Sequence, residues 1–214
     1  TTQEEDDEAI IKNIAERFNV LDDMTRAVTN GDIRAMIVSG PPGVGKSFGV
    51  EAIINKTNLF DDISGNPARA EVIKGSATAI GLYQALYKHS NENHVLVFDD
   101  CDAILFDEVS LNLLKGALDS GKSRRISWLA ESRVLKENDV PSSFVFKGSV
   151  IFITNIKFDG VRSQRMRDHL DALQSRCHYL DLNLDTPREK VLRIKQIAKD
   201  GHLFEDLGLD QIAQ

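Results

Sequence analysis

Apolar runs and stretches with helical spacing alternate along this chain. The apolar runs predict five strands, at about residues 34–39, 70–74, 95–98, 149–154 and 178–182. Helical spacing of apolar positions predicts helices at about 8–29, 48–56, 78–89, 108–119 and 168–173, with a loop over 58–66. The run at 95–98 has no polar position, as expected for a strand covered on both faces. Strands that alternate with helices favour the α/β class, with a parallel sheet and right-handed crossovers.

The pattern changes after Thr186-Pro187, a pair that is typical of a helix start. Beyond it the apolar positions fit only a helix, at Val191, Leu192, Ile194, Ile197 and Ala198. The sequence therefore predicts an α/β domain over residues 1–185 and the beginning of a helical unit over 186–214. So short a unit buries little surface on its own, and we expect the natural protein to continue past Gln214.

Composition and charge set bounds on the class of protein. Hydrophobic residues make up 42% of the 214 residues and charged residues 28%, an ordinary globular mixture. The net charge of −7 excludes a surface that is basic throughout, although it leaves room for a local basic patch. No apolar run reaches the length of a membrane span, and the acidic start does not resemble a signal peptide. Cys101 and Cys177 fit neither a disulfide framework nor a zinc site, so we expect a reducing, intracellular location, the cytoplasm.

Residues 40–47 read Gly-Pro-Pro-Gly-Val-Gly-Lys-Ser and fit the phosphate-loop pattern G-x-x-x-x-G-K-[ST] in full. A predicted strand precedes the octet and a predicted helix follows it, which is the context that this motif requires. The glycines let successive N–H groups face phosphate oxygens, and the helix start adds its positive dipole end. Lys46 is placed to reach the β- and γ-phosphates, and the Ser47 hydroxyl to bind Mg²⁺. The residues expected to bind the nucleotide are Gly40, Pro41, Pro42, Gly43, Val44, Gly45, Lys46, Ser47 and Phe48.

Polar residues at the ends of two further strands extend this site. Asp99 ends the run at 95–98, where a carboxylate can hold Mg²⁺, and Asp100 is placed to orient and deprotonate the attacking water. Asn155 follows the strand at 149–154 and can position the same water near the γ-phosphate. Together with Lys46, we expect these residues to serve catalysis. The alternative is that the Asp pair and Asn155 are ordinary turn residues.

Arg176 precedes the last predicted strand, in the triplet Ser175-Arg176-Cys177. This position suits a guanidinium that is offered to the nucleotide of a neighbouring subunit, where it would neutralise charge that develops on the γ-phosphate. The alternative is a surface arginine that interacts with the end of a helix.

Taken in order, four segments resemble the Walker A, Walker B, sensor 1 and arginine-finger motifs of the AAA+ ATPases. They are Gly40–Ser47, Val95–Asp100, Ile151–Asn155 and Ser175-Arg176-Cys177, of which the last is similar to the triplet of clamp-loader subunits. The resemblance covers roughly residues 10–185, and 186–214 resembles the start of the family's helical lid. It implies the three-layer P-loop fold with a sheet in the order 5-1-4-3-2.

The resemblance also implies an ATP hydrolase that uses ATP and Mg²⁺. It implies a homo-oligomer, a ring or spiral such as a hexamer, in which Arg176 acts in trans, with Arg165 as the second choice. Asp100 stands where the family usually has Glu, so hydrolysis is slow or the water is held differently. The sensor 2 residue is expected beyond Gln214, and adenine recognition within Ala15–Leu21.

Residues 120–148 contain a basic cluster, Lys122, Arg124 and Arg125, close to Trp128. Such a cluster can follow a nucleic-acid backbone while the aromatic ring stacks on a base. The alternative is a solvated loop with Trp128 in the core. The leading hypothesis is therefore an ATPase that remodels or loads a macromolecule, first in DNA replication or recombination. A protein-remodelling motor and a slow ATP-dependent switch or scaffold are the alternatives.

Overall fold

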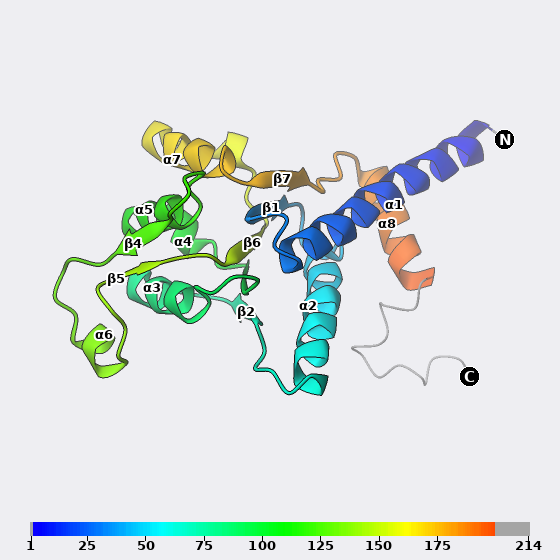
Figure 1. Ribbon diagram of the computed structural model, residues 1–214. Helices are drawn as coiled ribbons and strands as arrows, with labels where there is room; N and C mark the ends of the chain where they lie inside the picture. Colours follow the sequence, from blue (N-terminus) through cyan, green and yellow to red (C-terminus); the bar gives the residue numbers. More distant parts are fainter. Residues whose placement is uncertain (1, 200–214) are drawn as a thin grey trace.

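The computed structural model describes residues 2–199 and has the mixed α/β class expected from the sequence (Figure 1). Five parallel strands form one sheet in the order β2-β3-β6-β1-β7. The strands are β1 (Ala35–Ser39), β2 (Ala70–Lys74), β3 (Val95–Asp99), β6 (Ser149–Thr154) and β7 (His178–Asp181). Counted along the chain, the strands of this sheet lie in the order 5-1-4-3-2, so the expected fold class is confirmed.

The three inner strands are the most apolar because both of their faces are covered. Every residue of β1, β3 and β6 is buried, whereas the edge strands β2 and β7 are partly exposed. Along β1, Ala35 and Ile37 face one core while Met36 and Val38 face the other. This alternation follows from the geometry of a strand, in which successive side chains point to opposite faces.

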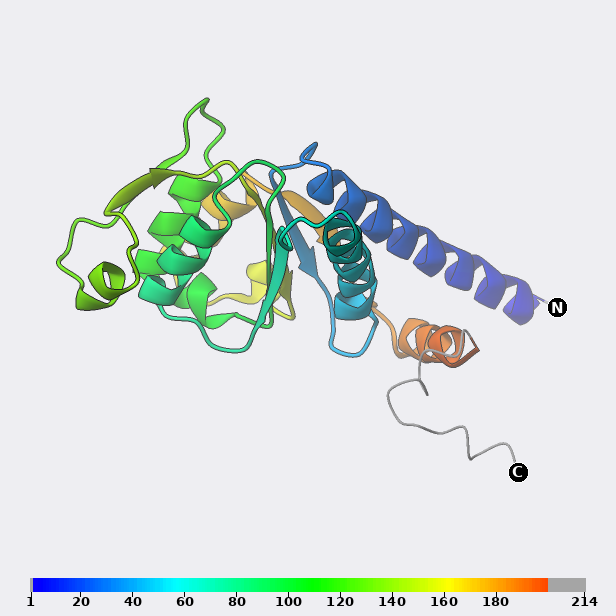
Figure 2. The same ribbon diagram turned by 60° about the horizontal axis from the view of Figure 1, so that its bottom comes forward.

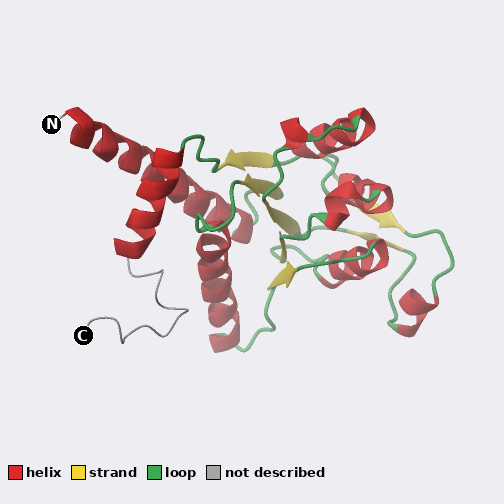
Figure 3. Ribbon diagram, turned by 180° about the vertical axis from the view of Figure 1, so that it is seen from behind, coloured by secondary structure: helices red, strands yellow, loops and turns green. Residues whose placement is uncertain are grey.

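Helices cover both faces of the sheet (Figure 3). One face carries α1 (Thr2–Thr29) and α2 (Lys46–Ile63), which bury residues such as Leu21 and Ile54. Side chains of this kind contribute about 1.5–3 kcal/mol each when fully buried. The other face carries α3 (Ala79–Lys88), α4 (Ala103–Phe106), α5 (Glu108–Ala117) and α7 (Gln164–Gln174), the last reached through the short 3-10 helix η1 (Phe158–Gly160).

Two helices are longer than the sequence predicts. The N-terminal half of α1 projects from the body of the domain (Figure 2). The predicted loop at 58–66 was wrong, because α2 continues to Ile63. Asn58 is tolerated inside this helix since its amide bonds both backbone groups of Ala70, at 2.9 and 3.1 Å.

Across residues 2–199, no helix combines the length and the apolar character needed to cross a membrane.

Residues 120–148 form an antiparallel hairpin for which the sequence analysis assigned no elements. It consists of β4 (Arg125–Ser127), α6 (Arg133–Glu137) and β5 (Ser143–Val145), and α6 lies at the end that is farthest from the main sheet (Figure 1). Ile126 and Phe144 face each other across the two strands, and both are buried in the core under α3 and α5. The base of the hairpin is thus anchored by apolar contacts.

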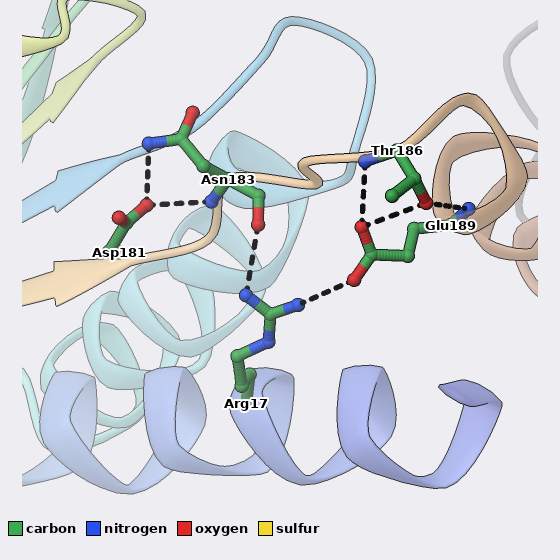
Figure 4. Close-up of polar contacts among 5 residues, drawn as sticks. All are labelled: Arg17, Asp181, Asn183, Thr186 and Glu189. Atoms are coloured by element: carbon green, nitrogen blue, oxygen red, sulfur yellow. Dashed lines mark hydrogen bonds and ion pairs between the residues drawn. The ribbon is translucent and has the colours of Figure 1, made fainter. Parts of the chain in front are cut away.

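The helix α8 (Pro187–Lys199) begins where the Thr186-Pro187 pair predicts. Thr186 and Glu189 form a capping box, in which the Glu189 N–H donates to the Thr186 hydroxyl and the Thr186 N–H donates to the Glu189 carboxylate. Arg17 of α1 donates to the Asn183 carbonyl at 2.9 Å and lies 3.9 Å from the Glu189 carboxylate (Figure 4). These contacts fix the start of α8 against α1. The remainder of the predicted helical unit, residues 200–214, lies outside the described residues.

Candidate active site

The phosphate-loop octet joins the end of β1 to the start of α2. Gly43 and Gly45 have φ angles of +76° and +98°, in the left-handed region that favours glycine. At Gly43 there is open space for a side chain, so the backbone angle rather than crowding explains the glycine. Turns of this kind direct consecutive N–H groups to one side and form an anion-binding concavity at a helix start.

Lys46 connects the loop to the neighbouring strand end. Its ammonium group donates to the carbonyls of Gly40 and Pro41, at 2.7 and 2.8 Å, and to the Asn155 side-chain oxygen at 2.9 Å. Burial lowers the pKa of Lys46, and the charges of Asp100 and Asp99 oppose that shift. The three bonds draw the ammonium group into the site from the first turn of α2.

Ser47 and Asp99 place two oxygens side by side. The Ser47 hydroxyl donates to the Asp99 carboxylate at 2.9 Å, and Asp99 is only 4% exposed. Burial raises the pKa of Asp99, although the bond from Ser47 acts in the opposite direction. A hydroxyl and a carboxylate are hard oxygen ligands of the type that Mg²⁺ prefers, so the donor set fits the expected metal.

Asp100 and Asn155 meet at the carboxyl edge of the sheet because β3 and β6 are neighbours, with Asp99 opposite Ile153. The Asn155 amide donates to the Asp100 carboxylate at 2.9 Å. Asp100 has a φ angle of +53°, and its N–H donates to the Ile153 carbonyl at 3.1 Å. The structure therefore brings the predicted residues Lys46, Asn155 and Asp100 into one hydrogen-bonded chain.

A cavity of about 790 Å³ lies beside this chain, between α1, α2 and α8. Six residues of the octet and its flank line it: Pro42, Gly43, Gly45, Lys46, Ser47 and Phe48. Gly40 and Pro41 do not line the cavity and hold Lys46 through their carbonyls, and the Val44 side chain is buried against Ile14 and Leu184. The predicted loop residues thus divide into those that face the cavity and those that support it.

The far wall of the cavity combines part of the segment expected to recognise adenine with a residue of α8 that the sequence analysis did not identify. Within the segment expected to recognise adenine, Ala15, Phe18 and Asn19 line the cavity, whereas Leu21 is buried in the core. Arg193 of α8 lies over the Phe18 ring, 3.6 Å from its centroid, and donates to the Val44 carbonyl at 3.0 Å. Only the folded chain reveals this arginine, because no local pattern connects it to the loop.

Arg176 lies away from this cavity. It precedes β7, whereas the octet follows the neighbouring parallel strand β1, so the two are at opposite ends of the sheet. Arg176 donates to the Ala172 carbonyl at the end of α7 and lines a second cavity of about 530 Å³ with Arg34 and Ser120. Arg165 pairs with Glu108 at 2.5 Å. The structure does not bring either arginine to the phosphate loop of the same chain.

The basic cluster of the hairpin is divided between core and surface. Arg124 is 7% exposed, donates to the Ala117 carbonyl at 3.0 Å and lies over the Phe146 ring. Burial, with a smaller effect of Arg34, lowers its pKa to about 10. Trp128 packs against Tyr83 with ring centroids 5.7 Å apart. The packing of Trp128 against the core agrees with the alternative that the sequence analysis left open for this segment. Lys122 and Arg125 are exposed, whereas the buried Arg124 does not belong to an exposed basic cluster.

Comparisons with known proteins place these residues in a wider context. The family model described as "ATPase family associated with various cellular activities (AAA)" matches residues 36–171, which include the octet, Asp99 and Asn155. An uncharacterized 36.7 kDa protein of Enterobacteria phage T4, from the nrdC-mobD intergenic region, is 37% identical over 198 residues, 92% of this chain. The chain spans 59% of the length of that relative.

Among solved structures, the crystal structure of NtrX from Brucella abortus in complex with ADP is similar, with a TM-score of 0.50. The similarity covers 90% of this chain and 41% of that chain, at 13% sequence identity. At this identity the likeness concerns the fold alone.

Proposed function

Because this chain belongs to the AAA family of ATPases, we propose that it binds ATP with Mg²⁺ in the cavity between α1, α2 and α8 and hydrolyses it. The observation that carries this proposal is the convergence of Lys46, Asn155 and Asp100 in one hydrogen-bonded chain, next to the Ser47–Asp99 pair. The five side chains come from the octet and from the ends of two neighbouring strands.

Each group has a defined task in the proposed reaction. The N–H groups of the octet and the start of α2 hold the phosphates. Lys46 exchanges its carbonyl partners for β- and γ-phosphate oxygens, while Ser47 and Asp99 hold Mg²⁺. When bound, Mg²⁺ would neutralise charge on the phosphate oxygens. Asp100 accepts the proton of the attacking water, and the Asn155 amide orients that water.

We assign the nucleobase to the α1 side of the cavity. Ala15 and Phe18 offer an apolar surface there, and Arg193 and Gln196 of α8 face it. The contribution of α8 supports the division into a nucleotide-binding domain, residues 1–185, and the beginning of a helical lid, 186–214. A lid helix that touches both the loop and the base site would respond to nucleotide.

The second half of the site is proposed to come from a neighbouring copy. Arg176 lies at the end of the sheet that is opposite to its own octet, so it can act only on the nucleotide of another subunit. A ring or spiral homo-oligomer such as a hexamer repeats this pairing at every interface. Arg176 must then leave the Ala172 carbonyl, which is a single exposed bond.

The macromolecule that the ATPase acts on is proposed to be DNA, in replication or recombination. Exposed Lys122 and Arg125 on the hairpin and the Ser175-Arg176-Cys177 triplet support this candidate. A protein substrate is the second candidate, and a specific observation favours it: Leu129 is 92% exposed next to an apolar groove between α5 and β4. Titration with single-stranded DNA at two salt concentrations separates them, because a DNA-binding ATPase should show an affinity for DNA that falls with salt, whereas a protein remodeller should show no such affinity.

Hydrolysis itself is tested at Asp100. Asp100→Asn should lower kcat by about 10²-fold or more, because the amide cannot accept the proton of the water. An unchanged rate in Asp100→Asn would remove Asp100 from the role of base. If the wild type does not hydrolyse ATP at any protein concentration, the proposal of an ATPase fails and the protein is a nucleotide-dependent switch or scaffold. The short Asp100 side chain, which stands where the family usually has Glu, is consistent with that alternative.

A reducing cytoplasm is our proposal for where the protein acts. Cys101 and Cys177 are both free thiols. Burial raises the pKa of both, that of Cys177 to about 12, which keeps the thiols protonated and slow to form disulfides. Thiol labelling of the native protein should therefore be slow at neutral pH.

A further inference from the structure

Asp102 lies three residues beyond Asp99 and outside the cavity, yet it is bonded to the last residue of β6, directly before Asn155. The Thr154 hydroxyl donates to the Asp102 carboxylate at 2.7 Å. Asp102 precedes α4, but its side chain makes no capping bond to that helix. Thr154 is 1% exposed and Asp102 is half-buried, and their contact joins the loop after β3 to the end of β6.

Thr154 also shapes the turn around Asn155. Its hydroxyl oxygen accepts the Ile156 N–H at 3.0 Å, and its carbonyl accepts the Gly40 N–H at 3.3 Å. On the other side, the Ser39 hydroxyl donates to the Ile156 carbonyl at 2.9 Å. The residues on both sides of Asn155 are thereby held, while the Asn155 side chain bridges Lys46 and Asp100.

A hydroxyl has one proton, and its acceptor direction depends on where that proton points. With Asp102 as the acceptor, the Thr154 proton is directed away from Ile156 and a lone pair is directed toward the Ile156 N–H. Without the carboxylate, the hydroxyl can rotate and the Ile156 bond loses its orientation. The effect would reach Asn155, which lies between the two residues.

We propose that Asp102 is a positioning residue, which holds Asn155 against Lys46 and Asp100 by ordering the Thr154 hydroxyl. The role rests on the proposed hydrolysis of ATP, for which Asn155 must be in place. Asp102 itself touches neither the cavity nor the reacting atoms. Its effect should therefore appear in kcat and not in the binding of ATP.

Steady-state kinetics test the proposal with a matched set of variants. Asp102→Ala and Thr154→Val should each lower kcat about tenfold to a hundredfold, with KM for ATP within about threefold, because each removes a hydrogen bond to a charged group. The double variant should lose little more than either single variant, since both remove the same interaction. Asp102→Asn and Thr154→Ser keep an acceptor and a donor and should recover most of the rate.

Asp107 provides the control. It is an aspartate at the start of the next helix and caps α5, accepting from the Ser110 N–H at 2.8 Å. Asp107→Ala should lower the melting temperature without lowering kcat of the folded protein. Unchanged kcat in Asp102→Ala and Thr154→Val would overturn the proposal, and so would a loss of kcat as large in Asp107→Ala.

Hydrogen exchange of the Ile156 amide gives a readout that does not need turnover. Exchange should accelerate in Asp102→Ala and Thr154→Val and stay unchanged in Thr154→Ser, while the Val150 amide at the start of β6 serves as the internal reference. Unchanged Ile156 exchange would overturn the proposal even if kcat falls. If the wild type does not hydrolyse ATP, the proposed function fails, and this exchange measurement still decides the role of Asp102.

Discussion

The carboxyl edge of the sheet and the hairpin at 120–148 hold their polar side chains in different ways. At the sheet edge, Lys46, Asn155 and Asp100 come from distant parts of the chain and bond one another. In the hairpin, exposed polar groups bond close neighbours, as in the pairs Arg133–Glu137 at 2.6 Å and Ser127–Ser143 at 3.1 Å. The first region is fixed by the fold, whereas the second is fixed mainly by the apolar contacts at its base.

This difference separates two tasks. Chemistry on a phosphate needs groups whose positions are set before the substrate arrives, since misplacement of a reacting group costs rate. Contact with a macromolecule needs accessible groups that can adapt, and the hairpin offers Lys122, Arg125 and Leu129 at its surface. We therefore expect substitutions at the sheet edge to change catalysis and substitutions in the hairpin to change stability or partner binding.

Arg176→Ala has the largest expected effect. It tests whether the catalytic groups at the sheet edge are complete within one chain or need an arginine from a neighbouring subunit. Loss of a guanidinium that acts in trans should lower kcat by about 10³-fold or more. The affinity for ATP should be nearly intact, since no residue of the cavity is altered. Steady-state hydrolysis and equilibrium binding of a fluorescent ATP analogue measure the two quantities.

Two controls accompany this substitution. Arg165→Ala removes an exposed arginine from the preceding helix and should leave kcat nearly unchanged. Mixing Arg176→Ala subunits with Lys46→Ala subunits should restore part of the rate, because some interfaces then combine an intact Lys46 with an intact Arg176. A large loss of ATP affinity at normal kcat would contradict the assignment in trans.

Two lysine substitutions compare the regions directly: Lys46→Ala at the sheet edge and Lys122→Ala in the hairpin. The loss of a charge-assisted contact to phosphate should weaken ATP binding by about tenfold to a hundredfold. Lys122→Ala removes an exposed lysine of the hairpin and should leave ATP binding unchanged. Isothermal titration with ATP measures both. If the two variants bind ATP equally well, the buried ammonium group of Lys46 is not part of the nucleotide site.

The sequence predicted those features that depend on local order. Strand runs, the octet and the positions of Asp100 and Asn155 follow from short segments and from the rule that carboxyl ends of parallel strands share an edge. Features that depend on distant partners were missed. Arg193 meets Val44 across 149 residues, and Asn58 stays helical because of Ala70, so neither contact has a local signal.

In the hairpin, a local sequence pattern was present but did not predict the exposure of each residue. Three basic residues within four positions indicate a charged surface, but a strand places successive side chains on opposite faces. Ile126 therefore points to the core, while Arg124, just before β4, is drawn inward by the Ala117 carbonyl and the Phe146 ring. Charge alone did not predict which arginine would be buried.

Arg124→Met has the smallest expected effect and tests the division of the basic cluster. It removes the bond to the Ala117 carbonyl and the contact with Phe146, and should lower the free energy of unfolding by about 1–3 kcal/mol. Arg125→Met, one residue further along, should change that free energy by less than about 0.5 kcal/mol, because its side chain is exposed. Urea denaturation followed by circular dichroism measures both variants.

If the protein binds DNA, the salt dependence of binding should fall in Arg125→Met and stay unchanged in Arg124→Met. The reverse pattern, a stable Arg124→Met protein with weakened DNA binding, would contradict the assignment of Arg124 to the core. Arg124 would then be a surface residue that contacts DNA, as proposed for Arg125.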